Sequence, residues 1–261
     1  MLVLKLLLTP LLIAGATLVG RRYGPIASGW LVGLPLTAGP VALFLALEQG
    51  TVFAARSAQS TLLGPISVAL YVLTYCWCSL RVGWFVCFLC SWGVFFLITA
   101  LFDQFSLPVF VTFCAVLVFL LLVLRLLPGE RSAEVAPMQK TPRWDLPARM
   151  LTATLMVVFL TSAAQSLGPR LSGLLSPLPV FSTILAVFTH RILGAAAARA
   201  LLRGVVIGTL AYAVFFLIVS VLVVPYGIAL AFALALAGAL LTQGSTLWVI
   251  RRAQRLFVAR R

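Results

Sequence analysis

Acidic residues and histidine are nearly absent from the chain, which has five Asp and Glu and one His, His190, among 261 residues. This scarcity excludes a multi-histidine metal site and leaves too few titratable groups for a soluble hydrolase's triad or a kinase-like active site. The sequence also contains no Walker loop, dinucleotide fingerprint, HExxH or GxSxG motif, so ATP-driven transport and familiar hydrolytic chemistry lack their residues. We therefore expect no enzyme and no bound cofactor or metal.

Apolar residues make up most of the chain. Hydrophobic residues account for 63% and charged residues for only 9%, and the mean hydropathy is +1.17. A soluble domain is ordinarily about 45 to 50% apolar. The composition predicts an all-α polytopic membrane protein with about nine transmembrane helices at roughly 20 residues each. The predicted spans are 2–20, 26–47, 58–80, 82–102, 107–127, 147–166, 170–189, 203–224 and 226–250.

The formal net charge of +14 comes from basic residues that stand singly or in pairs at the ends of apolar runs. They form no amphipathic basic face, which argues against a nucleic-acid partner. With nine spans, 16 of the 19 basic residues fall on one side of the membrane. The positive-inside rule then places the N-terminus outside and the C-terminus in the cytoplasm.

An internal repeat divides the chain. Residues 24–50 match residues 168–194 without a gap, and ten of these 27 positions are identical. We expect a first four-helix unit at 1–103, a linking helix and cytoplasmic linker at 104–146, and a second four-helix unit with a basic tail at 147–261. Because five spans precede the second unit, it enters the membrane from the opposite face. The predicted architecture is therefore an inverted-topology repeat, as in many secondary transporters.

The second unit carries a recognisable set of residues: Ser172-Gly173-Leu174-Leu175, Pro179, Phe181, His190 and Gly194. In these it resembles the GlpM-like family of small bacterial inner-membrane proteins, which are four-span chains of about a hundred residues. The resemblance implies a fused tandem version of that family, located in the bacterial cytoplasmic membrane. The first unit is linked to the family only through the repeat and has Ala46 where the second has His190.

Prolines and glycine interrupt the second span at Leu34-Pro35-Leu36-Thr37-Ala38-Gly39-Pro40 and recur near Pro177 and Pro179. Each proline removes a backbone donor and clashes with the preceding turn. Paired broken spans are the best sequence indication of a transporter's midplane site, and the alternative is a pair of packing kinks. The candidate residues here are Ser28, Pro35, Thr37, Pro40, Ser172, Pro179, Ser182 and Thr183.

Further candidates are the few charged or titratable residues near span ends. Glu48 and Gln49 close the second span and are candidates to bind a proton or cation, or form a simple interfacial end. His190 stands at the related end of the seventh span as a candidate pH sensor, or an ordinary loop histidine. Lys5 and Arg149 occupy equivalent repeat positions and are candidates to bind phosphate, or membrane anchors.

Two GxxxG strings also stand inside predicted spans, at Gly29 to Gly33 and Gly204 to Gly208. Such spacing puts small residues on one helix face and predicts close helix approach.

These patterns favour a transporter or lipid-carrier flippase that is not ATP-driven. It would move an anionic substrate by alternating access at a site between the two repeats. The alternatives are a non-transporting accessory protein for exopolysaccharide or envelope assembly, and a small-anion channel. Expected partners are membrane lipids, anionic or polyprenyl-phosphate lipids among them. Fusion of two inverted units favours a monomer, with a homo-oligomer as the alternative.

Overall fold

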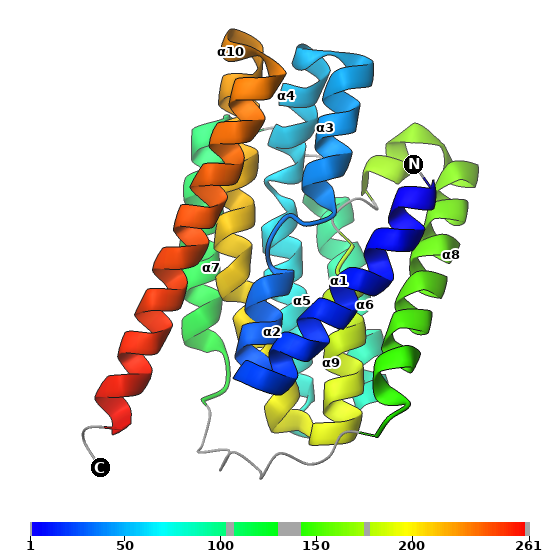
Figure 1. The fold of residues 1–261 in the computed structure, drawn as a ribbon, viewed down its shortest axis with the longest axis vertical. Helices are drawn as coiled ribbons and strands as arrows, with labels where there is room; N and C mark the ends of the chain where they lie inside the picture. Colours follow the sequence, from blue (N-terminus) through cyan, green and yellow to red (C-terminus); the bar gives the residue numbers. More distant parts are fainter. Residues whose placement is uncertain (1, 103–106, 130–141, 175–177, 259–261) are drawn as a thin grey trace.

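The computed structural model describes residues 2–102, 107–129, 142–174 and 178–258, and it leaves the side chains of 2–7, 160–174 and 249–258 undescribed. The secondary structure within these ranges is entirely helical, as predicted (Figure 1). The helices are α1 (Leu2–Tyr23), α2 (Pro25–Val32), α3 (Ala38–Gln49), α4 (Thr51–Thr61), α5 (Gly64–Cys78), α6 (Trp84–Phe102), α7 (Val109–Leu126), α8 (Asp145–Leu174), α9 (Val180–Leu193) and α10 (Ala195–Val258).

Four stretches of the described residues are long and apolar enough to cross a membrane. They are Thr51–Cys78, which combines α4 and α5, then Trp84–Phe102, Val109–Leu126 and Ala195–Trp248. The last of these is 54 residues long and contains a non-helical glycine, Gly227 (φ 77°, ψ 172°), where the chain reverses direction. These features are consistent with a multi-pass membrane protein.

Several predicted span boundaries differ from the helices observed. The predicted second span is two helices, α2 and α3, and the third begins at Thr51 instead of 58. The eighth begins at Ala195 instead of 203, and α8 continues through 167–169, where a loop was expected. Hydropathy reports apolar content, so polar or alanine-rich helical turns at the ends of a span escape it.

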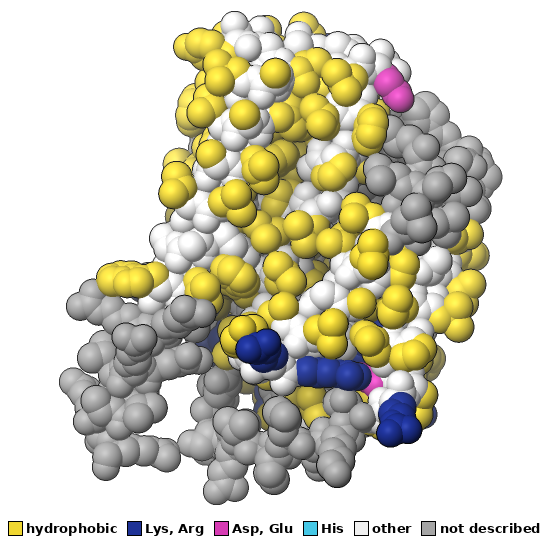
Figure 2. Space-filling view, in the orientation of Figure 1, with side chains coloured by type: hydrophobic (Ala, Val, Ile, Leu, Met, Phe, Trp, Pro, Cys, Tyr) yellow, Lys and Arg dark blue, Asp and Glu magenta, His cyan; other side chains and the backbone are white. Residues whose placement is uncertain are grey.

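The helices bundle lengthwise, and several of their connections lie at the two ends of the bundle (Figure 1). The α3–α4 turn and the reversal in α10 lie at the upper end, and the α1–α2 and α9–α10 turns lie at the lower end. Arg21 and Arg22 end α1, Arg125 ends α7, and His190 and Arg191 end α9. Basic side chains accordingly gather at the lower end of the visible face (Figure 2).

The long helix α10 contacts more of the bundle than any other described helix: it packs against α2, α3, α4, α5, α7 and α9. Its contact with α2 is close because glycines face each other. A Cβ added to Gly29 would overlap the carbonyl oxygen of Leu201, and one on Gly204 would overlap that of Ile26. Gly33 and Gly208 face each other in the same way. The helix contact that the two GxxxG strings predict is therefore confirmed.

The turn that ends α3 has a counterpart 144 positions later, at the end of α9. Gly50 adopts φ 84° and ψ 172°, and Gly194 adopts φ 88° and ψ 170°. Their amides donate to the carbonyls of Ala46 and His190, which are also equivalent positions. A positive φ of this size favours glycine, which explains why glycine stands at both sites.

Candidate functional site

The chain leaves helical geometry between α2 and α3, where the proline pattern predicts a break. Pro35 is buried in this segment. Its carbonyl accepts a hydrogen bond from the Gly39 amide at 2.8 Å, and the Leu36 amide donates to the Leu34 carbonyl at 2.8 Å. These local bonds satisfy part of the backbone that the break frees, as buried polar groups require. The break lies about halfway along the bundle (Figure 1).

A second break precedes α9, at the position equivalent to the first. Pro179 occupies the N-cap of α9 with φ −79° and ψ 47°. The amide and the hydroxyl of Thr183 both donate to the Pro179 carbonyl, at 2.8 Å and 2.7 Å. The Trp92 indole on α6 donates to the Thr183 hydroxyl at 3.0 Å. These contacts fix the start of α9 against α6.

The two breaks share one cavity of about 90 Å³. Its polar lining comes from Thr37 at the start of α3, Ser182 in α9, and Thr209 and Tyr212 in α10. No charged side chain is found among its described lining residues. The complete lining is Val32, Gly33, Leu34, Pro35, Thr37, Ala38, Gly64, Pro65, Val68, Leu178, Pro179, Phe181, Ser182, Val205, Thr209 and Tyr212.

Of the thirteen candidate residues, Pro35, Thr37, Pro179 and Ser182 are brought together in this lining. Thr183 lies one residue further along α9 and supports the break. The other described candidates lie outside the described lining: Ser28 is buried where α2 meets Gly20 of α1, Pro40 lies in the first turn of α3, and Glu48, Gln49, Arg149 and His190 stand near helix ends. The side chains of Lys5 and Ser172 lie outside the described residues.

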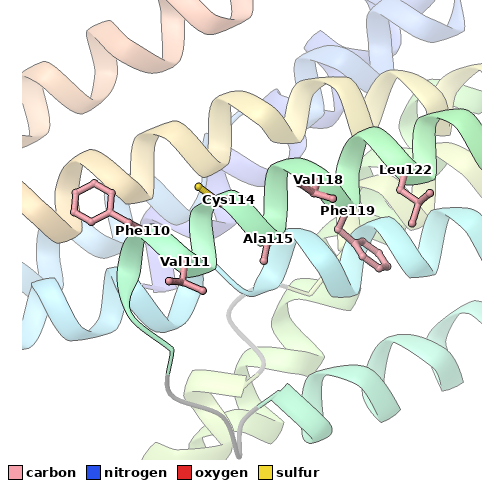
Figure 3. A pocket seen from close by; sticks show the side chains of 7 residues that line it. All are labelled: Phe110, Val111, Cys114, Ala115, Val118, Phe119 and Leu122. Atoms are coloured by element: carbon pink, nitrogen blue, oxygen red, sulfur yellow. The ribbon is translucent and has the colours of Figure 1, made fainter.

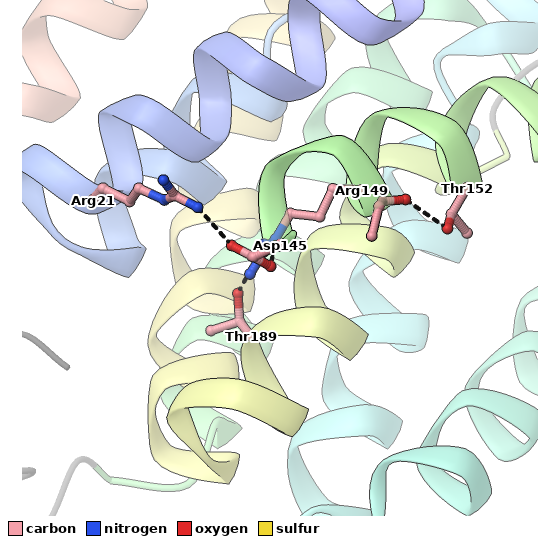
Figure 4. A network of polar contacts seen from close by, with 6 residues as sticks. Arg21, Asp145, Arg149, Thr152 and Thr189 are labelled. Atoms are coloured by element: carbon pink, nitrogen blue, oxygen red, sulfur yellow. Dashed lines mark hydrogen bonds and ion pairs between the residues drawn. The ribbon is translucent and has the colours of Figure 1, made fainter. Parts of the chain in front are cut away.

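Arg149 belongs to a polar cluster at the lower end of the bundle (Figure 4). Its Nε donates to Asp145 Oδ1 at 2.7 Å, and Nη2 of Arg21 donates to Asp145 Oδ2 at 2.9 Å. Arg149 Nη1 also reaches Thr189 Oγ1 at 3.4 Å, and its guanidinium stacks over the Phe188 ring at 5.4 Å. The guanidinium is therefore engaged by Asp145, away from the cavity.

His190 pairs with an aromatic residue of α5. Its Nδ1 lies 3.2 Å from the hydroxyl of Tyr75, and the two rings meet edge to face. Partial burial and, to a smaller extent, the positive charge of Arg199 hold the pKa of His190 below its ordinary value of 6.5. The imidazole is therefore neutral at pH 7.

Sequence reasoning did not find Gly64, Pro65, Thr209 and Tyr212 as parts of the site. A usable signal exists for the α10 pair, because Thr209 and Tyr212 border the same helix face as Gly208. Residues three or four apart share a helix face, so the GxxxG string of α10 indicates which neighbouring residues lie close to the same contact. For Gly64 and Pro65 the signal was a proline at a helix start, which is common at ordinary helix N-termini.

A larger hollow lies along the surface of α7 (Figure 3). It is lined only by apolar or weakly polar side chains: Phe110, Val111, Cys114, Ala115, Val118, Phe119 and Leu122. Such a surface on a membrane-length helix suits lipid contact. It offers nothing to recognise a polar ligand, so the cavity between the breaks is the better candidate site.

The fold and the cavity define a class: a protein that is helical throughout the residues that the structure describes, with four apolar stretches of membrane length and a small, partly polar cavity between two helix breaks. Comparison with known proteins does not narrow this class further, since no family model, no curated protein and no solved structure matches the chain.

Proposed function

We propose that this chain is a membrane transporter that works without ATP and holds its substrate in the cavity between the two broken helices. One observation carries the proposal. Pro35 and Pro179, 144 positions apart, border the same cavity, together with the hydroxyl-bearing side chains of Thr37 and Ser182. Broken helices that meet around a polar site at mid-depth are the common construction of secondary transporters.

The directions of the first helices of the two units support the same proposal. α1 begins near the upper end of the bundle whereas α8 begins at the lower end (Figure 1), and Arg21 near the end of α1 pairs with Asp145 at the start of α8. Two units of opposite orientation supply two related conformations when one unit rocks against the other. In this proposal the chain has nine spans in the bacterial cytoplasmic membrane. The GlpM-like resemblance stays a prediction.

The size of the cavity favours a small substrate over a polyprenyl-phosphate lipid carrier. A volume of about 90 Å³ is several times the roughly 10–15 Å³ that one water needs by the same kind of measure. That is room for a ligand of a few non-hydrogen atoms. The competing accessory-protein hypothesis assigns no role to the cavity, and this difference allows a test.

The test is two-sided chemical access to the cavity. A single cysteine replaces Ser182 in a full-length protein whose five native cysteines are changed to alanine or serine, reconstituted in vesicles. A membrane-impermeant thiol reagent is then applied to either face. Alternating access predicts that the reagent labels Ser182→Cys from either face. A condition that favours the conformation open to one face should lower the labelling from the opposite face.

Control positions make the result interpretable. Ala186→Cys, on the same helix and fully buried away from the described cavity lining, should resist the reagent from both faces. Exposed Gln49→Cys should react from one face only. Protection of Ser182→Cys from both faces, with Gln49→Cys labelled normally, would contradict the transporter proposal and favour the accessory protein.

A further inference from the structure

The end of α1 and the start of α8 meet at the lower end of the bundle and carry four arginines. Arg21 of α1 reaches Asp145 of α8 at 2.9 Å, which joins the two helix ends. Arg149 lies one turn into α8 and is buried, whereas Arg22 in the last turn of α1 and Arg143 just before α8 are exposed. Dark blue side chains are visible at this end of the molecule (Figure 2). We call this region the α1–α8 surface.

One carboxylate serves the four arginines of the α1–α8 surface. Both oxygens of Asp145 are occupied, one by Arg149 at 2.7 Å and the other by Arg21 at 2.9 Å. Neither Arg22 nor Arg143 forms an ion pair within the part of the chain that the structure describes. The other acidic side chain of that part lies in the last turn of α3, near the upper end (Figure 1). The surface therefore keeps an excess of positive charge that an anion from outside the chain can neutralise.

Apolar side chains point outward along the same two helices, directly above the arginines. On α1, Leu11 and Leu18 are more than half exposed, and Arg22 follows them at a spacing of four. On α8, Leu151, Leu155 and Phe159 are at least 60% exposed and also stand four residues apart. Residues at these spacings share one face of a helix. Each helix thus presents an apolar stripe that leads down to basic residues.

Two aromatic side chains mark the depth at which the stripes end. Tyr23 ends α1 and is 64% exposed, and Trp144 directly precedes α8 and is 54% exposed. The Arg22 guanidinium lies 5.5 Å from the centre of the Tyr23 ring. Tyrosine and tryptophan are enriched at the level of the lipid headgroups. This position puts the exposed arginines at headgroup depth and the apolar stripes at the depth of the acyl chains.

We propose that the α1–α8 surface binds anionic phospholipid, with its headgroups at Arg21, Arg22 and Arg143 and its acyl chains along the stripes that contain Leu18 and Leu151. A guanidinium donates two parallel hydrogen bonds to a phosphate group. The excess of arginine favours an anionic headgroup over a zwitterionic one, whose own cation would be repelled. This site is separate from the cavity between the helix breaks, so it does not depend on the proposed transport function.

The experiment is thermal unfolding of the full chain in detergent micelles in which phosphatidylglycerol replaces phosphatidylcholine at constant total lipid. Phosphatidylglycerol should raise the Tm in a saturable way, by mass action. Glycerol phosphate added without lipid should not raise the Tm at the same concentration, because it lacks the acyl chains that the apolar stripes bind. Equal stabilisation by glycerol phosphate would mean a site for free phosphate and would overturn the proposal.

The double variant Arg22→Gln and Arg143→Gln removes two exposed charges and leaves the buried Asp145 cluster intact. Each basic residue at a membrane surface contributes about fivefold to the attraction of an anionic lipid. The variant should therefore need roughly thirtyfold more phosphatidylglycerol for half of the full Tm increase. This concentration reports lipid affinity even where the substitutions lower the Tm itself.

The matched control is the double variant Arg81→Gln and Arg191→Gln, which removes two other exposed arginines. Arg191 ends α9 at the lower end, and Arg81 lies two residues after Ser79, which accepts a hydrogen bond from Arg199 near the start of α10. Its phosphatidylglycerol affinity should stay close to that of the unsubstituted chain. Equal weakening in the two double variants would mean attraction to net charge without a site. That result, or the absence of any saturable effect of phosphatidylglycerol, overturns the inference.

Discussion

At the scale of single residues, the carboxylate of Asp145 joins two arginines from different helices. Its side chain is 1% exposed, that of Arg149 is 5% exposed, and that of Arg21 is 33% exposed. Two positive charges thus share one buried negative charge at the junction of α1 and α8, with Thr189 of α9 beside them. A cluster of this kind stabilises the fold only while each buried charge keeps a partner of opposite charge.

Asp145→Asn should therefore destabilise the protein strongly. The substitution leaves the buried Arg149 guanidinium without its counter-charge, and breaking a buried pair in this way costs about 3–5 kcal/mol. Thermal unfolding in detergent measures the loss. Asp145→Asn combined with Arg149→Met should recover much of it, because no unpaired charge then stays at that position.

The matched control is Glu48→Gln, the same carboxylate-to-amide change at an exposed position, which should leave the Tm nearly unchanged. An equal Tm for the Asp145 and Glu48 variants would show that the cluster does not contribute to stability.

His190 gives the molecule a predictable response to acid. Its pKa is lowered in the folded protein, mainly by burial and secondarily by Arg199, so the unfolded chain takes up the proton first as the pH falls. Stability should be fully present above about pH 6.5 and decrease below it. The decrease should be no more than about 2–4 °C in Tm, because the imidazole is only partly buried.

Thermal unfolding between pH 7.5 and pH 5 checks this expectation. His190→Gln keeps a hydrogen-bonding side chain and removes the titration, so its Tm should depend less on pH. Parallel curves for the two proteins would assign the acid response to other groups.

At the scale of whole helices, the contact between α2 and α10 depends on glycine. A Cβ on Gly29 or Gly204 would meet backbone atoms, which cannot move aside as a flexible side chain can. Gly29→Ala and Gly204→Ala should each destabilise the protein by about 1–3 kcal/mol or more, as overpacking does. The Tm in detergent and the elution profile on size exclusion measure the effect.

Gly93→Ala is the control for these substitutions. Gly93 lies inside α6, and an added Cβ there meets nothing within 4 Å. Alanine is the better helix former by about 0.5–1 kcal/mol, so this variant should be as stable as the unsubstituted chain or slightly more stable. Equal losses in all three variants would contradict a steric role for the α2–α10 contact.

The helical fold could be predicted from the long apolar runs. Both breaks and the glycine contact could be predicted because proline and glycine act on the backbone locally. The α4 start at Thr51 could not be predicted, because Arg56, Ser57, Gln59 and Ser60 lower the hydropathy of this helix until it resembles a loop. The site was only partly predictable. Pro35 and Pro179 marked it, whereas Tyr212 reaches it only through the packing of α10 against α2, which a single sequence does not display.

At the scale of the molecule, the two ends of the bundle differ in charge. The ends of α1, α7 and α9 bring basic side chains to the lower end, and Glu48 ends α3 at the upper end (Figure 1, Figure 2). The cavity between the two breaks lies between these ends, and no charged side chain is found among its described lining residues. The basic end would thus raise the local concentration of an anionic substrate on its side of the membrane.

The charge difference also predicts how the protein sits in its membrane. By the positive-inside rule we expect the basic end to face the cytoplasm. Gln49, at the opposite end, should then face outward. Arg81 should face inward, because it lies two residues after Ser79, whose hydroxyl accepts from Arg199 near the start of α10. In intact cells that produce a cysteine-free variant, an impermeant maleimide should label Gln49→Cys and should reach Arg81→Cys only after the membrane is permeabilised. The reverse pattern would mean that helix packing, and not the distribution of arginines, sets the orientation. The basic end would then face outward, and a substrate from outside would enter the cavity from that end. Labelling of both positions from one side would contradict the placement of the α3–α4 and α5–α6 turns at opposite ends of the bundle. It would thereby also contradict the alternating access that the paired breaks support.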